Sequence, residues 1–378
     1  MQSEQKRGMS LGYFNLARGV GMILIVLGHS INLYLTPSVN LSPDSAPALF
    51  SGAGGVLGGG MMAAFFMISG IGFFRRSFRK CVSIQRRLLL KPYCLAAAAV
   101  LLTKLLLALV KRRSFFAHGG ELVLTYLLGL NAEGGGEFLG IPVESVSIFW
   151  FVLALFGGWI IYNTISFLDS EVLRYGCAAV CAVLGYQMTL ISRVWPYCIH
   201  IAFLAAGYLA AGEFIKKRGL LDRRIRAGWW ILIWAVLAVC AAFGQVNIVA
   251  GVWRLGLLDV LGSFCAGFVI LKGYALFMRR EHDGKAAGIL EEIGFHSIWI
   301  ICLHAYEKVI FPWYRVAAAL PDSPWLGVAL CFGGRCAVMY LLYKIVTGAA
   351  GMVRDRRFGR SGLSGRISEE EKKQSDGE

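Results

Sequence analysis

Charged residues are scarce in this sequence of 378 residues, since Lys, Arg, Asp and Glu together make up 16% of it. Hydrophobic residues make up 57%, and the mean hydropathy is +0.62. A soluble domain of this length needs far more charged surface, because geometry limits the fraction of residues that a core can hold. The composition therefore excludes an ordinary soluble domain and indicates a membrane-embedded protein.

Paired cysteines and phosphate-binding loops are missing as well. The ten cysteines form no Cys-x-x-Cys pair, and most lie in apolar runs, where a thiol acts as a small hydrophobic group. We infer neither a disulfide framework nor a metal site. The glycine run that ends the stretch 37–60 is not followed by Gly-Lys-Ser/Thr, so we expect a flexible linker there rather than a phosphate loop.

A formal net charge of +15 raises the question of nucleic-acid binding. The basic residues, however, lie in short clusters between apolar runs, which is where the positive-inside bias of membrane proteins places them. The charge therefore reflects membrane topology, and we expect no nucleic-acid partner.

Apolar runs of about 16 to 25 residues recur along the chain, and this length crosses a hydrocarbon core of ~30 Å. Backbone polar groups in lipid must be satisfied internally, so such runs form helices. The segment 122–130 is too short to span and is expected to be re-entrant or interfacial. The sequence predicts an all-α, polytopic helical bundle with about ten transmembrane helices, at 16–35, 61–74, 92–110, 147–167, 175–191, 196–215, 228–243, 253–277, 289–306 and 325–347.

The basic clusters also predict the orientation of this bundle. Ten spans with a cytoplasmic N-terminus place four basic groups, at 75–91, 216–226, 279–285 and 354–360, on the cytoplasmic side. One cluster, 111–113, falls on the other side. We therefore expect both termini in the cytoplasm, a membrane domain over residues 1–350 and a charged, disordered cytoplasmic tail over 351–378.

Arg18 and His29 form the most informative pair of ionisable residues within the predicted spans. Eleven residues at 100° each return to within about 20° of the same helix face, and the two residues lie ~16 Å apart along the axis. This spacing places Arg18 at the cytoplasmic mouth and His29 near mid-membrane. Imidazole is the usual general base near neutral pH. The alternative is that Arg18 anchors the interface and His29 bonds a neighbouring carbonyl.

Four further ionisable residues lie within predicted spans, and such residues are expensive in lipid. Arg335 and Asp259 could form an intramembrane ion pair that serves packing or substrate binding. Lys104 could extend its stem toward the interface. His304 is either structural or functional.

Several short motifs in one order resemble the acyltransferase family 3 membrane proteins. The first helix contains the Arg-x10-His pattern of Arg18 and His29. The further matches are Phe65-Phe66 with Ser69-Gly70, Arg86-Arg87 before Pro92-Tyr93, Phe149-Trp150-Phe151 at the start of the segment 149–155, and Ile293-Gly294 with Ser297, followed by His304. The matches together cover about residues 15–304. Asn15 stands where the family usually has Asp.

The resemblance implies a ten-helix fold that transfers an acyl group, commonly acetyl from acetyl-CoA, to a hydroxyl of a sugar or another acceptor. His29 and Arg18 are then the expected catalytic residues, with His29 as the general base. Arginine forks grip phosphate well, so Arg75, Arg76, Arg86 and Arg87 are expected to bind the coenzyme A donor, the alternative being topology signalling alone. Candidate substrate-binding residues are Asn15, Ser69, Trp150, His304 and Arg335.

The sequence therefore predicts a multi-pass enzyme of the cell membrane, a membrane-bound O-acyltransferase with no bound cofactor. Its partners are the lipid bilayer, an acyl-CoA and a hydroxyl-bearing acceptor, namely a cell-envelope glycan, a lipid-linked sugar or a small exported molecule. Two other classes stay open. A transporter or flippase also places charges inside a helical bundle, and a catalytically inactive relative could bind and sense its ligand.

Overall fold

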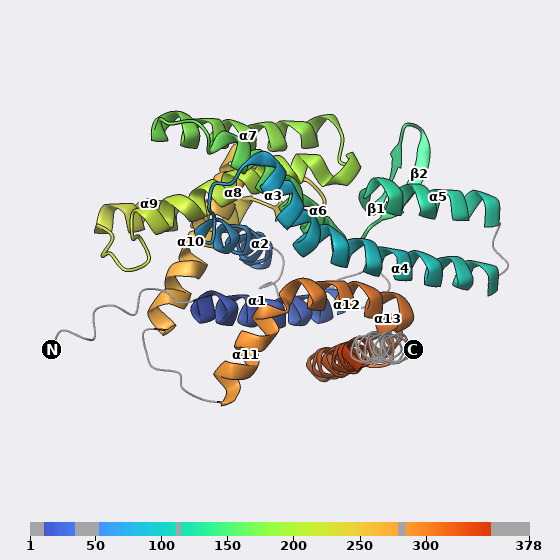
Figure 1. Ribbon diagram of the computed structural model, residues 1–378. Coiled ribbons are helices and arrows are strands. Elements are labelled where there is room, and N and C mark those ends of the chain that lie inside the picture. Colours follow the sequence, from blue (N-terminus) through green and yellow to red (C-terminus); the bar gives the residue numbers. More distant parts are fainter. Residues whose placement is uncertain (1–10, 35–52, 111–114, 279–284, 349–378) are drawn as a thin grey trace, which may run out of the picture.

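The computed structural model describes residues 11–34, 53–110, 115–278 and 285–348, and most of these residues are helical (Figure 1). The predicted tail 351–378, the basic clusters 111–113 and 354–360, and all of the cluster 279–285 but Lys285 lie outside the described residues. The elements are α1 (Leu11–Ile31), η2 (Asn32–Tyr34), α2 (Ala53–Ile71), α3 (Phe78–Gln85), η4 (Arg86–Leu90), α4 (Lys91–Val110), α5 (Phe115–Leu128), β1 (Asn131–Phe138), β2 (Ile141–Ser145), α6 (Phe149–Ile165), α7 (Glu171–Ile191), η5 (Pro196–Cys198), α8 (Ile199–Lys217), α9 (Ala227–Phe243), β3 (Val246–Asn247), β4 (Val252–Trp253), α10 (Leu257–Met278), α11 (Lys285–Phe295), α12 (Ser297–Ile310), α13 (Trp313–Ala318) and a final helix, Pro324–Gly348.

Five helices of the described residues are long and apolar enough to cross a membrane. A sixth span results if α11 and α12, which meet at a bend of 77°, count as one. The protein is thus a helical membrane protein, whereas the count of ten spans and the position of the termini stay predictions. The five long candidates are Phe14–Tyr34, Phe78–Val110, Pro196–Lys217, Leu257–Phe277 and Pro324–Gly348.

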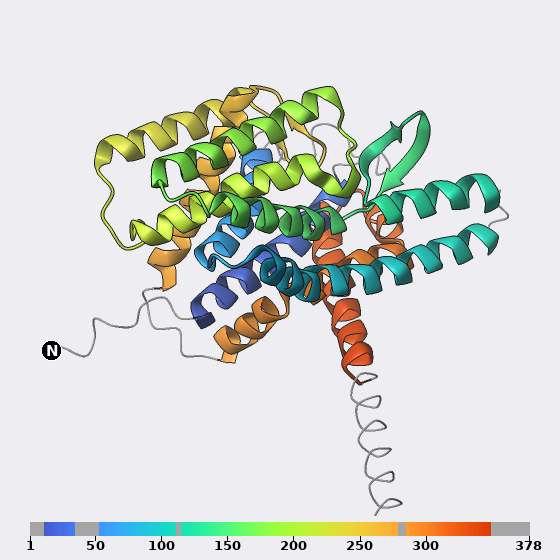
Figure 2. The same cartoon turned by 45° about the horizontal axis from the view of Figure 1, so that its top comes forward.

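The expected flexible linker over 37–60 was wrong for residues 53–60, and residues 37–52 lie outside the described residues. The glycine run before residue 61 belongs to helix α2, where Gly59 faces Val246 of β3 and Gly60 faces Ala266 of α10; the missing side chains let these elements approach. Segment 122–130 belongs mostly to α5, a helix of 14 residues that packs beside α4 (Figure 2), and its re-entrant or interfacial position stays a prediction. The stretch after it forms the antiparallel hairpin β1–β2 within a mainly helical fold.

Helix α8 lies at the centre of the molecule and packs against α2, α6 and α7. Its close contact with α2 depends on two glycines. A Cβ at Gly70 would meet the backbone carbonyl of Leu209, and one at Gly212 would meet that of Met67. The two helix backbones therefore touch directly, in the way that small residues permit in membrane bundles. Gly70 is the glycine of the predicted helix 2 motif, and its role here is packing.

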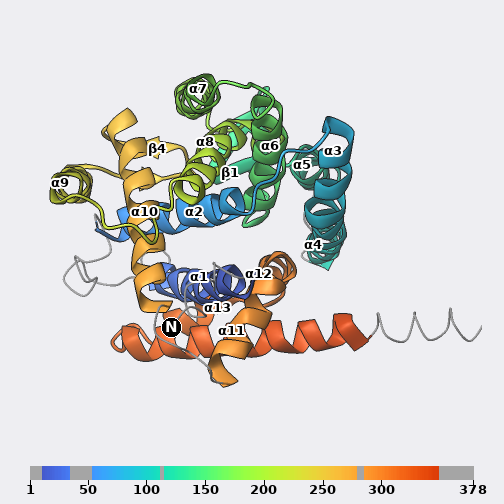
Figure 3. The same ribbon diagram turned by 60° about the vertical axis from the view of Figure 1, so that its left-hand side comes forward.

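The helices form two layers, as Figure 3 shows. One layer contains α2, α6, α7 and α8, and the other contains α1, α11, α12, α13 and the helix Pro324–Gly348. Helix α10 runs along both layers. Helix α12 also packs against α4, and α1 packs against both α11 and α12.

Helix α6 connects two ends of the molecule that differ in chemistry. Its first residue follows the β1–β2 hairpin, and we call this side the hairpin end. Near its last turn, Asn163 accepts a hydrogen bond from the backbone N–H of Arg76 at 3.0 Å and donates one to the Arg76 carbonyl at 2.9 Å. The side that contains Arg75 and Arg76 is called the basic end. At 1.5 Å per residue, the two ends of α6 are ~24 Å apart.

Candidate active site

Two histidines from different helices meet at the hairpin end. His29 lies in the last turn of α1, and His304 is buried in α12. Their ring centroids are 5.2 Å apart and their planes are tilted by 56°. The tertiary structure therefore brings the histidine of the first motif next to the histidine of the last one.

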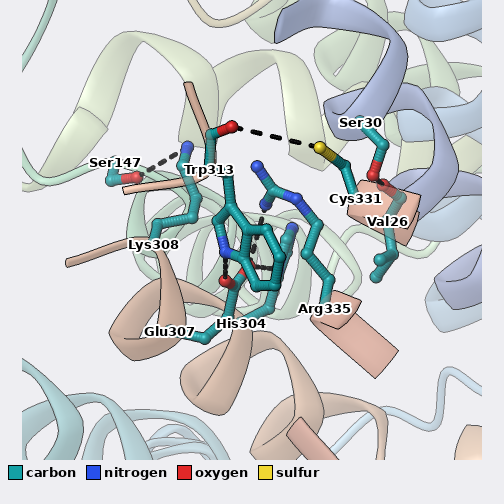
Figure 4. A network of polar contacts seen from close by, with 9 residues as sticks. All are labelled: Val26, Ser30, Ser147, His304, Glu307, Lys308, Trp313, Cys331 and Arg335. Carbon is teal, nitrogen blue, oxygen red and sulfur yellow. Dashed lines mark hydrogen bonds and ion pairs between the residues drawn. The ribbon is translucent and has the colours of Figure 1, made fainter. Parts of the chain in front are cut away.

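Glu307 links His304 to two more side chains (Figure 4). Its Oε1 lies 2.8 Å from His304 Nδ1 and accepts a hydrogen bond of 2.8 Å from Arg335 Nη1. Its Oε2 accepts a hydrogen bond from the indole N–H of Trp313. The guanidinium of Arg335 also lies over the Trp313 ring, 5.5 Å from its centroid. All four side chains are buried, and the carboxylate joins α12, α13 and the helix Pro324–Gly348.

This arrangement leaves two polar atoms free for a ligand. Among the described residues, neither His304 Nε2 nor Arg335 Nε has a hydrogen-bond partner, although both are buried. Buried polar atoms are nearly always paired, so each such exception calls for a reason. If Nδ1 of His304 donates to Glu307, its Nε2 presents a lone pair that can accept a proton. A carboxylate that orients an imidazole in this way is the arrangement used in acyl-transfer triads.

Arg18 lies on α1 away from the hairpin end, ~16 Å along the helix axis from His29. Its Nη1 donates a hydrogen bond of 3.4 Å to the side-chain oxygen of Asn15. Next to this pair, α11 approaches α1 without a side chain between the backbones. A Cβ at Gly294 would collide with the carbonyl oxygen of Asn15, and one at Gly19 with that of Leu290. Gly19 and Gly294 therefore let α11 pack directly on α1 beside Arg18, and this packing fixes the position of Arg18.

Of the four arginines predicted to bind the donor, Arg75 and Arg76 lie near the last turn of α6, at the basic end. Arg86 and Arg87 belong to η4, which packs beside the middle of α6, between the contact of Cys81 with Trp159 and that of Tyr93 with Phe149. Arg86 and Arg87 line a surface groove of about 580 Å³ together with Lys91 and Ser83. The guanidinium of Arg75 lies over the Phe167 ring, 5.5 Å from its centroid. Arg76 is fixed through its backbone by Asn163. Three of these arginines are exposed, and Arg76 is half-buried.

Two other candidate residues serve packing in this structure. The hydroxyl of Ser69 donates to the Phe65 carbonyl of its own helix at 3.2 Å. Trp150 is buried against Phe66 and Phe151 in the core around α6. Neither makes a polar contact with the histidine pair among the described residues, so their assignment to substrate binding stays a prediction.

The expected ion pair between Asp259 and Arg335 was wrong. Asp259 Oδ2 accepts hydrogen bonds from the backbone N–H groups of Leu255 at 2.8 Å and Gln245 at 3.3 Å, so it holds the loop before α10. Arg335 pairs instead with Glu307, which the sequence analysis missed. The predicted span 289–306 ends one residue before Glu307, so this carboxylate was not counted among intramembrane charges. Its spacing of three residues from His304 was the available signal.

Lys104 was expected to extend toward an interface, and it forms an ion pair. Its Nζ lies 2.6 Å from Glu144 Oε2 of β2, and it faces the Tyr126 ring. The hairpin therefore supplies the counter-charge of this lysine. Among the described residues, no group of three or more His, Cys, Asp or Glu side chains is arranged to hold a metal ion.

Fold and site together define a class: an integral membrane helical bundle whose buried polar centre combines two imidazoles, one carboxylate and one guanidinium. The sequence model of the acyltransferase 3 family, described as an acyltransferase domain, matches residues 11–344, and the chain belongs to this family. No curated protein and no solved structure matches the chain. The family makes the protein a membrane acyltransferase, with an acyl donor and a hydroxyl acceptor as its partners.

Proposed function

We propose that the protein is a membrane-bound O-acyltransferase of the cell membrane that moves an acyl group, above all acetyl from acetyl-CoA, to a hydroxyl. The acceptor is a cell-envelope glycan, a lipid-linked sugar or a small exported molecule. The observation that carries the proposal is the contact between His29 and His304 beside the Glu307–Arg335 pair, in a chain that belongs to an acyltransferase family.

In the proposed reaction, His29 removes the proton from the acceptor hydroxyl, whose oxygen attacks the thioester carbonyl of the donor. The C–S bond then breaks, the acyl group stays on the acceptor oxygen as an ester, and the coenzyme A thiolate takes the proton from the imidazolium. His304, whose Nδ1 donates to Glu307, accepts a hydrogen bond from the acceptor at its free Nε2. The guanidinium of Arg335 keeps Glu307 ionised and in place.

The donor is proposed to extend from the basic segment 75–91 to the histidine pair. Its phosphates bind the arginines of this segment, Arg86 and Arg87 above all, since they line a groove there. Arg18 lies between the basic end and His29 along α1. The long pantetheine arm of the donor then reaches the histidine pair from this side, and the acceptor approaches from the hairpin end. This arrangement supports the predicted entry of the donor from the cytoplasm.

The test is release of coenzyme A from acetyl-CoA by the purified protein in the presence of cell-envelope extract. A general base contributes about 10²–10⁴-fold to the rate, so His29→Ala is expected to lower extract-dependent release at least 100-fold. His296→Ala is the matched control, because this half-buried histidine lies between α11 and α12, away from the network, and it should release coenzyme A within twofold of the wild type. Absence of release with any short-chain acyl-CoA, from folded protein, would favour transport or ligand sensing.

A further inference from the structure

Two lysines lie at the base of the β1–β2 hairpin, and only one of them has an ion-pair partner. Lys104 is neutralised by Glu144 at 2.6 Å. Lys308, on α12 directly after Glu307, forms no ion pair within 4.0 Å with any carboxylate of the described chain. Its side chain is exposed, whereas Glu307 and His304 beside it are buried. Lys308 is therefore an accessible positive charge at the edge of the candidate active site.

The carboxylates around Lys308 are engaged or distant. Glu307 has both oxygens occupied by His304, Arg335 and Trp313. Glu133 of β1 acts on Lys308 electrostatically, but from beyond ion-pair distance. The remaining charges that act on Lys308 are the cations Arg335 and Lys104. Arg335 and Lys104 are each paired with a carboxylate, so Lys308 is the cation of this group that has no ion pair within 4.0 Å among the described residues.

A strained serine lies next to Lys308. Ser147 has a φ of 56°, which L side chains rarely adopt and which costs of order 1–3 kcal/mol outside glycine. It lies between β2 and α6, and its Oγ accepts a hydrogen bond of 3.3 Å from Lys308 Nζ (Figure 4). A hydroxyl that accepts from an ammonium keeps its own hydrogen for donation. Lys308 and Ser147 together therefore present two adjacent hydrogen-bond donors.

The position of these two hydrogen-bond donors fits the acyl acceptor better than the acyl donor. Lys308 acts electrostatically on both His29 and His304, so an anion that it binds lies near the proposed point of transfer. The function proposed above assigns the donor phosphates to the separate groove that Arg86 and Arg87 line. The anion at Lys308 is then a group of the acceptor.

We propose, on the basis of the function proposed above, that Lys308 and Ser147 bind the carboxylate of an acidic sugar and so select an acidic glycan as the acyl acceptor. One ammonium and one hydroxyl match a carboxylate with its single charge. A phosphate monoester carries about −1.5 to −2 charges at neutral pH and would need a second cation.

The test compares trigalacturonate with its methyl ester, in which methyl groups remove the carboxylate charges, in equilibrium binding to the purified full chain. Wild-type protein is expected to bind the acid at least tenfold more tightly at low salt. Lys308→Gln should remove this preference, and Lys308→Arg should retain most of it. Glu133→Gln should raise the affinity for the acid, because it removes the one repelling carboxylate. Lys285→Gln, an exposed lysine of α11, is the control with wild-type behaviour.

Equal affinities of wild-type protein for the two trisaccharides, or a preference that survives in Lys308→Gln, would overturn the proposal. So would tighter Lys308-dependent binding of a sugar phosphate than of the acid. Binding requires no acyl transfer, so these results can be read even if the proposed function fails. Where transfer occurs, Lys308→Gln should raise KM for the acidic acceptor and change kcat little. A fall in kcat with neutral and acidic acceptors alike would make Lys308 a transition-state group and contradict its role in selection.

Discussion

The ion pair between Glu307 and Arg335 near the hairpin end is buried, whereas Arg86 and Arg87 of the basic segment 75–91 are exposed. Glu307 and Arg335 lie within 2.8 Å of each other with almost no solvent contact, and His304 shares the same carboxylate oxygen. Arg86 and Arg87 line an open groove. A buried charge without its partner is strongly destabilising, while an exposed charge acts mainly through a field that salt screens. Ionisable residues are therefore held rigidly in the buried network and are free to rearrange in the exposed groove, which matches the roles proposed for the two places.

The largest effect on the free energy of unfolding is expected from Glu307→Gln. The change leaves Arg335 as an uncompensated buried charge, which costs about 3–5 kcal/mol, and it removes the group that orients His304. The free energy of unfolding and the rate of acyl transfer should both fall. Glu291→Gln on the exposed face of α11 is the control and should change neither. A loss of stability below about 1 kcal/mol with full transfer would contradict the pairing described here.

A second test asks whether the contact between α1 and α11 positions Arg18. Gly294→Ala adds a methyl group against the carbonyl of Asn15, and overpacking of this kind costs about 1–3 kcal/mol. Gly288→Ala in the same helix enters open space and should stabilise the protein by up to about 1 kcal/mol, because Ala has the higher helix propensity. Thermal unfolding of both variants measures the contrast. Equal melting temperatures would show that α11 is free to move away from α1.

The smallest effect on stability is expected from the double change Arg86→Gln and Arg87→Gln. Both residues are exposed, so the free energy of unfolding should change by less than about 0.5 kcal/mol. The KM for acetyl-CoA should rise about tenfold at low ionic strength, and the rise should shrink with added salt. Arg223→Gln with Arg224→Gln in another exposed basic loop is the control. A rise of the same size in the control would leave Arg86 and Arg87 with a role in topology alone.

Much of the membrane architecture could be predicted from the sequence, because long apolar runs have few other solutions in lipid. The residues of the candidate site were only partly predictable. His29, His304 and Arg335 were identified as ionisable residues inside apolar runs. Glu307 was missed because it lies one residue beyond a predicted span, and Trp313 because it lies in the stretch between the spans 289–306 and 325–347. The hairpin was missed because its glycine-rich strand lacks the alternating pattern of a half-buried strand.

Composition and motif order alone determined that this chain is a helical membrane protein of the acyltransferase 3 family, because both are read from local runs of residues. Only the tertiary structure decided which charges meet. Arg335 forms its ion pair with Glu307, whereas Asp259 accepts hydrogen bonds from the loop before α10. An ion pair depends on distances between helices, and sequence separation does not set these distances. The contact between His29 and His304 joins residues 275 positions apart for the same reason, through the packing of α12 on α1.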